Sequence, residues 1–174
     1  DAPGVIFNLS VGYNLAGIKE ANVQWYLDKV SDISAEKAAM VDTVAQWFPA
    51  VRDVTIPDRM SDSMTLSTMH GCPPDEIESI SRYLIDERGL HTSVKLNPTL
   101  LGAEGVRGIL NHELGFEDVE VPDEAFGHDL KYPDAVPMLR RLGAAAAKRG
   151  VIFGVKLSNT LEVTNHRGIF PENE

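Results

Sequence analysis

The feature that most constrains how this chain folds is a regular alternation of short apolar runs and helical patterns. Five apolar runs are predicted to be strands, and from the second run onwards they recur about every 27 to 33 residues. This is the spacing of β–α units joined by right-handed crossovers. The runs are mostly continuous, which is typical of a parallel sheet covered on both faces. The predicted strands are Gly4–Ser10, Ser63–Thr68, His91–Asn97, Asp118–Val121 and Val151–Ser158.

Helical patterns fill the intervals between these runs. Ser34 is predicted to cap the second of two helices in the long first interval, and Gly89 is the expected stop of the next one. The segment Pro122–Asp134 is rich in Pro, Gly and Asp and is predicted to be a loop that could act as a lid. The expected helices are Gly17–Val30, the segment from Ser34 to Phe48, Asp75–Arg88, Ala103–Leu114 and Ala135–Arg149.

The pattern predicts an α/β fold with parallel strands, and the length of 174 residues suits a single domain over residues 1–174. A complete eight-stranded barrel takes about 250 residues. Five strands therefore suit either a doubly wound sheet or part of a (β/α)8 TIM-like barrel, and the pattern leaves both open. The chain begins with Asp1 and ends in the polar run "FPENE", so we expect a fragment of a larger protein.

Composition excludes several classes of function. The net charge is −10, which argues against a nucleic-acid or anionic-membrane surface because phosphate contacts need clustered Lys and Arg. No apolar run approaches the roughly 18 to 20 residues of a membrane helix. The single cysteine, Cys72, allows no internal disulfide and no cysteine-based zinc or iron–sulfur site, so no metal site is expected here. A cytoplasmic location fits this cysteine usage.

Polar residues cluster where the predicted strands end. In any parallel α/β arrangement the carboxyl ends of the strands share one rim, and sites are built there. We therefore expect these side chains to line a common site. They are Asn8 and Ser10 after the first strand, His70 and Cys72 after the second, Lys95 and Asn97 at the third, and Lys156, Asn159 and Thr160 at the last.

Two lysines lie inside apolar strands in closely similar surroundings, "SVKLNPT" for Lys95 and "GVKLSNT" for Lys156. A lysine within a covered strand must reach the rim, pair with an acid, or bind an anionic or electron-rich group. The sequence leaves these alternatives open. Asparagines at the same strand ends can donate and accept hydrogen bonds at once, which suits the edge of a planar heterocycle.

Cys72 lies in a turn between Gly71 and two prolines and has two interpretations. Free cysteines are often buried and inert. A helix that begins near Asp75 would instead direct N–H groups toward the thiol and lower its pKa. His70, two residues earlier, could then share the rim with a working Cys72.

Five longer blocks of the chain are distinctive: "NLSVGYNLAGIK", "TLSTMHGCPPDEIESI", "VKLNPTLLG", "PDAVPMLRRL" and "FGVKLSNTLEV". These blocks resemble the bacterial selenate reductase subunit family, whose members are iron–sulfur flavoproteins related to dihydropyrimidine dehydrogenase and the glutamate synthase small subunit. The resemblance spans nearly the whole chain. It implies a segment of an FMN-binding (β/α)8 barrel from a large multidomain protein.

The resemblance also implies roles for the strand-end residues. Asn8 and Ser10 match a first-strand "NLS" motif, Lys95 and Asn97 match a "VKL" lysine motif, and an "NT" pair that approaches flavin or substrate matches Asn159 and Thr160. Lys156 lies where two of these motifs overlap. In the pyrimidine enzymes the catalytic cysteine follows the "NLS" run directly, whereas Cys72 follows the second strand and does not inherit that role by register.

Cofactors and partners follow from the same resemblance. FMN is expected in the intact protein but not tightly bound here, since the phosphate-binding loops belong to the last barrel strands. Iron–sulfur clusters and FAD or NAD(P)H are expected in other domains, which with a small-molecule substrate are the expected partners. The open strand edges of a partial barrel also predict self-association or a compensating contact.

Three functions are compatible with these residues. The first is an oxidoreductase segment in which Lys95 or Lys156 stabilises reduced flavin and Cys72 with His70 serves as an acid. The second is an aldolase or lyase in which one lysine forms a Schiff base. The third is a non-catalytic barrel that docks redox domains.

Overall fold

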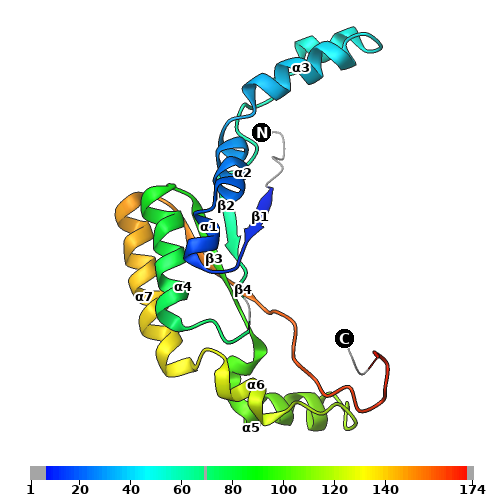
Figure 1. The fold of residues 1–174 in the computed structure, drawn as a ribbon, viewed down its shortest axis with the longest axis vertical. Helices are drawn as coiled ribbons and strands as arrows, with labels where there is room; N and C mark the ends of the chain where they lie inside the picture. The colour runs from blue at the N-terminus through cyan, green and yellow to red at the C-terminus, as the bar shows by residue number, and fades with distance from the viewer. Residues whose placement is uncertain (1–6, 69, 172–174) are drawn as a thin grey trace.

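A computed structural model describes residues 7–68 and 70–171, and within them it contains one four-stranded parallel sheet (Figure 1). The strands pair in chain order, β1 with β2, β2 with β3, and β3 with β4. This sequential order is that of a barrel, because a doubly wound sheet reverses its strand order at a switch point. The predicted α/β fold is confirmed. The strands are β1 Asn8–Val11, β2 Ser63–Leu66, β3 His91–Leu96 and β4 Phe153–Leu157.

Within residues 7–68 and 70–171, seven α-helices connect and extend these strands. Two of them continue into a π-helical turn, α4 into Tyr83–Glu87 and α5 into Gly108–Glu113, so the two predicted helices there are each formed by two consecutive elements. The helices are α1 Leu15–Ile18, α2 Ala21–Ser31, α3 Ser34–Val44, α4 Pro74–Arg82, α5 Gly102–Arg107, α6 Asp123–His128 and α7 Tyr132–Arg149. Short 3-10 turns lie at Pro49–Asp53 and Pro98–Leu101.

The two faces of the sheet differ sharply. On one face Leu66, Val94 and Leu96 are buried in a cluster that also takes side chains from α1, α2, α4 and α7. Figure 1 shows α4 and α7 side by side along this face. The opposite face carries polar residues in register: Asn8 beside Ser63 and His91, Ser10 beside Thr65 and Ser93, and Lys95 beside Lys156. The expectation of a sheet covered on both faces is therefore wrong for the described residues, and one-sided cover is the barrel arrangement.

The predicted strand Asp118–Val121 is also wrong. Side chains take two of its backbone carbonyls: Arg107 Nη2 donates to the Val121 oxygen at 2.6 Å, and Asn111 Nδ2 to the Val119 oxygen at 2.8 Å. The Glu120 oxygen accepts a single backbone hydrogen bond, from the Thr164 N–H at 2.8 Å. Val121 packs with Val106 and Ala125 in a small second core. Two valines, separated by Glu120, are enough to attach this segment to the small core, but they are too few to form a β-strand that pairs with the sheet.

Two other local predictions need correction. The predicted loop Pro122–Asp134 contains α6 and the first turn of α7. Ser34 does not cap α3 through its side chain; its backbone N–H donates to the Asp32 carboxylate at 2.9 Å. The first predicted strand can be compared only from Phe7 onwards, because residues 4–6 lie outside the described part of the chain.

Helix α3 stands away from the sheet as an arm, with the chain returning beside it to β2 (Figure 1). It has no buried residue. In the described part of the chain, no helix combines the length and apolar character needed to cross a membrane.

Candidate functional site

A buried carboxylate organises the carboxyl end of the sheet. Asp129, in the turn between α6 and α7, is only 5% exposed. Its Oδ2 accepts a hydrogen bond from Thr99 Oγ1 at 2.6 Å and from Asn97 Nδ2 at 3.1 Å. Its Oδ1 accepts from the Gly71 backbone N–H at 3.0 Å. One side chain thus joins the loops that follow β2 and β3.

The same contacts determine the charge of Asp129. Burial raises the pKa of a carboxyl group, but the hydrogen bonds from Thr99, Gly71, His70 and Asn97 together outweigh burial and lower the pKa of Asp129. Asp129 is therefore ionised near neutral pH. It is a fixed negative charge next to the rim.

His70 is the half-buried partner of this carboxylate. Its Nδ1 lies 3.1 Å from Asp129 Oδ2 and 3.1 Å from Asn97 Nδ2. Because an ionised carboxylate only accepts hydrogen bonds, we assign the proton to Nδ1, and the short Asn97 contact is then not a hydrogen bond. This arrangement fixes the ring and leaves Nε2 as the acceptor. Gly71 follows with φ of 78°, a left-handed conformation that glycine adopts without penalty and that turns its N–H to Asp129.

Asn97 and Asn159 tie β3 to the end of β4. Asn159 Nδ2 donates to Asn97 Oδ1 at 2.9 Å, and the Asn159 backbone N–H donates to the Leu96 oxygen at 3.0 Å. Both polar atoms of the Asn97 amide are thus used within the protein. Asn97 links the network together. The side-chain oxygen of Asn159, Oδ1, has among the described residues only a long 3.5 Å contact from Thr160 Oγ1.

Cys72 lies close to this network. With Lys95, Asn97 and Asp129 it lines a small cavity of about 20 Å³. Burial raises the pKa of the Cys72 thiol, and the negative charges of Glu76 and Asp75 add to the effect, while a hydrogen bond with Thr68 opposes it. The expected lowering by the start of α4 is therefore wrong. Cys72 carries its proton near neutral pH, which suits a proton donor and not a thiolate nucleophile.

The two lysines are neighbours. Lys95 and Lys156 are register partners on β3 and β4, so their side chains leave the same face of the sheet. Lys95 is half-buried and Lys156 is exposed. Among residues 7–68 and 70–171, no carboxylate forms an ion pair with either ammonium. The alternative that an acid satisfies them inside the fold is thus excluded for the described residues.

Three predicted residues lie outside the network. Asn8 starts β1 in register with Ser63, at the amino end of the sheet, where its Nδ2 donates to Ser63 Oγ at 2.8 Å. Its expected place on the rim is wrong, because β1 begins at Asn8, which the sequence placed near the carboxyl end of the predicted strand Gly4–Ser10. Ser10 lies midway along β1, and Thr160 is exposed beyond Asn159.

Sequence reasoning missed Asp129 and assigned no role to Thr99. Asp129 lies in a segment predicted to be a loop, where acids are common and carry no periodic signal. One hint was present: an Asp flanked by the apolar Leu130, in a segment expected to fold over the rim. The contact depends on α6, which turns the chain back toward β3.

Comparison with known proteins gives a consistent result. Residues 1–174 match the family model described as "Oxidoreductase YgfK, N-terminal TIM-barrel domain". Two curated relatives, both named "Putative oxidoreductase YgfK", come from Escherichia coli K12 and O157:H7. Each is 44% identical over 192 residues, which cover 97% of this chain and 18% of the relative. The chain thus spans less than a fifth of these relatives' length. No solved structure matches it significantly.

Proposed function

The chain belongs to the family of the oxidoreductase YgfK N-terminal TIM-barrel domain, and from this premise we propose that it forms part of the barrel of a longer, flavin-dependent oxidoreductase. Its rim would contact FMN and a small substrate. The observation that carries this proposal is the continuous network of Asn159, Asn97, Asp129 and His70 beside Lys95. It joins the carboxyl ends of three neighbouring strands, which is where barrel enzymes place their chemistry.

His70 is the group best placed to move a proton. Its Nδ1–H is held by a buried, ionised carboxylate, and this pairing orients the ring and leaves Nε2 facing away from Asp129. Nε2 can then take a proton from a substrate or return one. Cys72, with its raised thiol pKa, can act only as a donor in the same cavity. Asp129 and Thr99 position these groups and do not themselves react.

FMN is the cofactor that the sequence resemblance implies, and the rim residues fit one edge of its ring. The Lys95 ammonium, which pairs with no carboxylate among the described residues, and Asn159 Oδ1, which has only the long contact from Thr160 there, are the donor and acceptor that the pyrimidine edge of a flavin requires. The cavity between Lys95 and Cys72 is only about 20 Å³, so the ring would lie over the rim. Bound FMN supplies hydride transfer. An ammonium next to the ring favours electron uptake by electrostatic stabilisation.

The test is the flavin content of the full-length polypeptide that contains this chain. Wild-type protein should release stoichiometric FMN, identified against FAD by chromatography. Lys95→Met should lower the FMN content or shift the flavin potential to a more negative value. Lys148→Met, which removes an exposed lysine from the end of α7, should change neither. A folded, full-length protein without FMN would eliminate this proposal and favour the non-catalytic scaffold.

The substrate follows from a second measurement on the same protein. The resemblance to selenate reductase subunits and to dihydropyrimidine dehydrogenase implies two substrate classes, an oxyanion and a pyrimidine. The lysine pair favours a substrate that is negatively charged or becomes so. Anaerobically reduced protein should be reoxidised by one of these two substrate classes and not by the other. If the imidazole of His70 transfers the proton, His70→Gln should slow this reoxidation by roughly 100-fold or more.

A further inference from the structure

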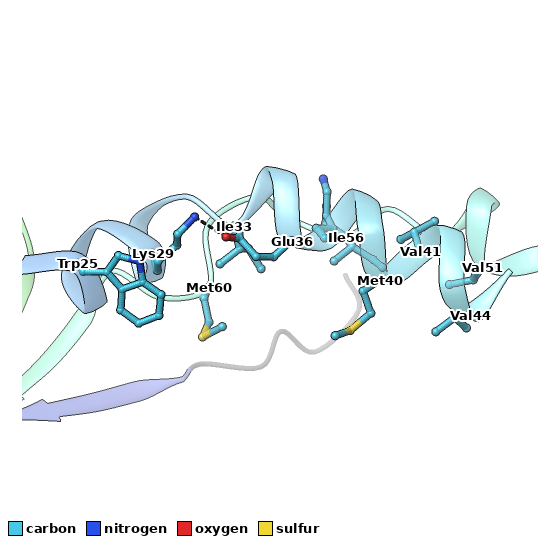
Figure 2. A pocket seen from close by; sticks show the side chains of 11 residues that line it. Trp25, Lys29, Ile33, Glu36, Met40, Val41, Val44, Val51, Ile56 and Met60 are labelled. Atoms are coloured by element: carbon cyan, nitrogen blue, oxygen red, sulfur yellow. Dashed lines mark hydrogen bonds and ion pairs between the residues drawn. The ribbon is translucent and has the colours of Figure 1, made fainter. Parts of the chain in front are cut away.

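An apolar groove runs along the arm formed by α2, α3 and the chain that returns to β2. Its volume is about 460 Å³. Figure 2 shows Trp25, Met60 and Met40 projecting to one side of the arm, with Val44 and Val51 further along it. Trp25 is 64% exposed and Met40 is 67% exposed, whereas Val44 and Val51 are half-buried. A contiguous apolar patch of this kind marks an interaction surface.

The arm lacks the packing that normally stabilises a helix. α3 has 11 residues and none is buried. Isolated helices shorter than about 12 to 15 residues are marginal in water, so α3 needs a cover from outside the described fold. The arm also lies beyond the amino ends of β1 and β2, away from the loops that carry the rim network (Figure 1). A cover there leaves the rim open.

The charged residues around the groove indicate the chemical character of the segment that binds there. Lys29 pairs with Glu36, as the dashed line in Figure 2 marks, and Lys37 pairs with Asp58. The charged groups at the groove thus neutralise one another and offer no net charge to attract a charged partner. The complementary surface is apolar and uncharged.

We propose that the groove binds an apolar helix from the part of the same polypeptide that lies outside these 174 residues. The relatives carry more than four fifths of their length outside the matched region, so such a polypeptide has ample chain to supply the helix. Tethering within one polypeptide gives an effective concentration in the millimolar range. The arm is therefore a docking element between this barrel segment and a neighbouring part of its own chain.

Site-specific photocross-linking in the full-length polypeptide tests this proposal. The photoreactive residue p-benzoylphenylalanine replaces Met40 in the groove. In a matched control it replaces Ala39, the adjacent exposed residue that does not line the groove. Irradiation should give a product of single-chain mass from the Met40 position. The peptide that is cross-linked to position 40 should come from a part of the polypeptide outside these 174 residues. The yield of this product should be at least about tenfold above the yield from the Ala39 control.

Every other outcome overturns the proposal. A product of two-chain mass would mean that a second copy fills the groove, and a product with a different protein would mean a separate partner. A cross-link within the 174 residues, or equal yields from both positions, would mean that no outside helix docks there. The readout requires no flavin, so the proposal stands or falls separately from FMN binding. Both variants are first checked for wild-type circular dichroism.

Discussion

At the scale of single residues, Asp129 is the centre of the rim network. It brings together loops that are far apart in the sequence, because its contacts Thr99 and Gly71 lie 30 and 58 positions away. The same carboxylate orients His70. Any change at Asp129 should therefore affect stability and rim chemistry together, and stability is the part that can be measured without a substrate.

Replacing Asp129 by Ala should lower the free energy of unfolding by about 2 to 4 kcal/mol, because the Thr99 hydroxyl and Gly71 N–H lose their acceptor in a buried position. Denaturant unfolding followed by circular dichroism measures the loss. Glu117→Ala, which removes an exposed carboxylate, should stay within about 0.5 kcal/mol of wild type. Equal losses in the two variants would contradict the role of Asp129 as the centre of the network.

The lowered pKa of Asp129 makes a second prediction, about pH. A carboxyl group whose pKa is lower in the folded state stabilises the protein fully above its unfolded value, which is near 3.8. That stabilisation is lost as the pH falls through the lower folded value. In Asp129→Asn the contribution is absent throughout. The stability difference between wild type and Asp129→Asn should therefore be constant above about pH 5 and shrink in more acidic solution. A difference that grows on acidification would contradict this assignment.

At the scale of elements, the carboxyl ends of β1 and β2 approach unusually closely. A Cβ at Gly12 would lie 2.1 Å from the Ser67 backbone oxygen, next to the hydrogen bond from the Ser67 N–H to the Val11 oxygen at 2.8 Å. Only a residue without a side chain fits there unless the strands separate.

Gly12→Ala should therefore destabilise the protein by about 3 kcal/mol, at the upper end of what overpacking costs. Gly108→Ala is the matched control, because nothing lies within 4 Å of its Cβ position and its backbone is helical. That substitution should be neutral or stabilise by up to about 1 kcal/mol. Thermal unfolding of both variants measures the contrast, and a tolerated Gly12→Ala would mean that β1 can move away from β2.

Elements with a strong local signal were predictable from the sequence. β2, β3 and β4 follow apolar runs, and α4 and α7 follow periodic stripes, because burial against one common core imposes these patterns. The segment 118–121 has valines too, yet side chains of Arg107 and Asn111 take the carbonyls of Val121 and Val119 in place of a neighbouring strand. Asp129 acquires its role only through folding of α6. Contacts of this kind depend on tertiary geometry and leave no periodic signal in the local sequence.

At the scale of the whole molecule, the sheet has two edge strands, β1 and β4, whose outer edges are unpaired in the described part of the chain. In the described part of the chain β1 pairs only with β2, and β4 pairs only with β3. One polar face and two free edges are what part of a barrel presents before closure. Exposed apolar side chains on the outer strand, Val155 at 46% and Leu157 at 73%, add to this incompleteness.

The 174-residue chain on its own should therefore self-associate through its strand edges, as unpaired edges offer a template for another chain. Sedimentation velocity should show a mass that rises with concentration. Val155→Lys places a charge on the edge strand and should shift the chain toward monomer. Ile169→Lys adds the same charge to an exposed position outside the sheet and controls for net charge. If the chains associate through β4, only Val155→Lys should reduce the self-association. If the unsubstituted chain is a monodisperse monomer, the strand edges are protected in another way and the prediction is wrong.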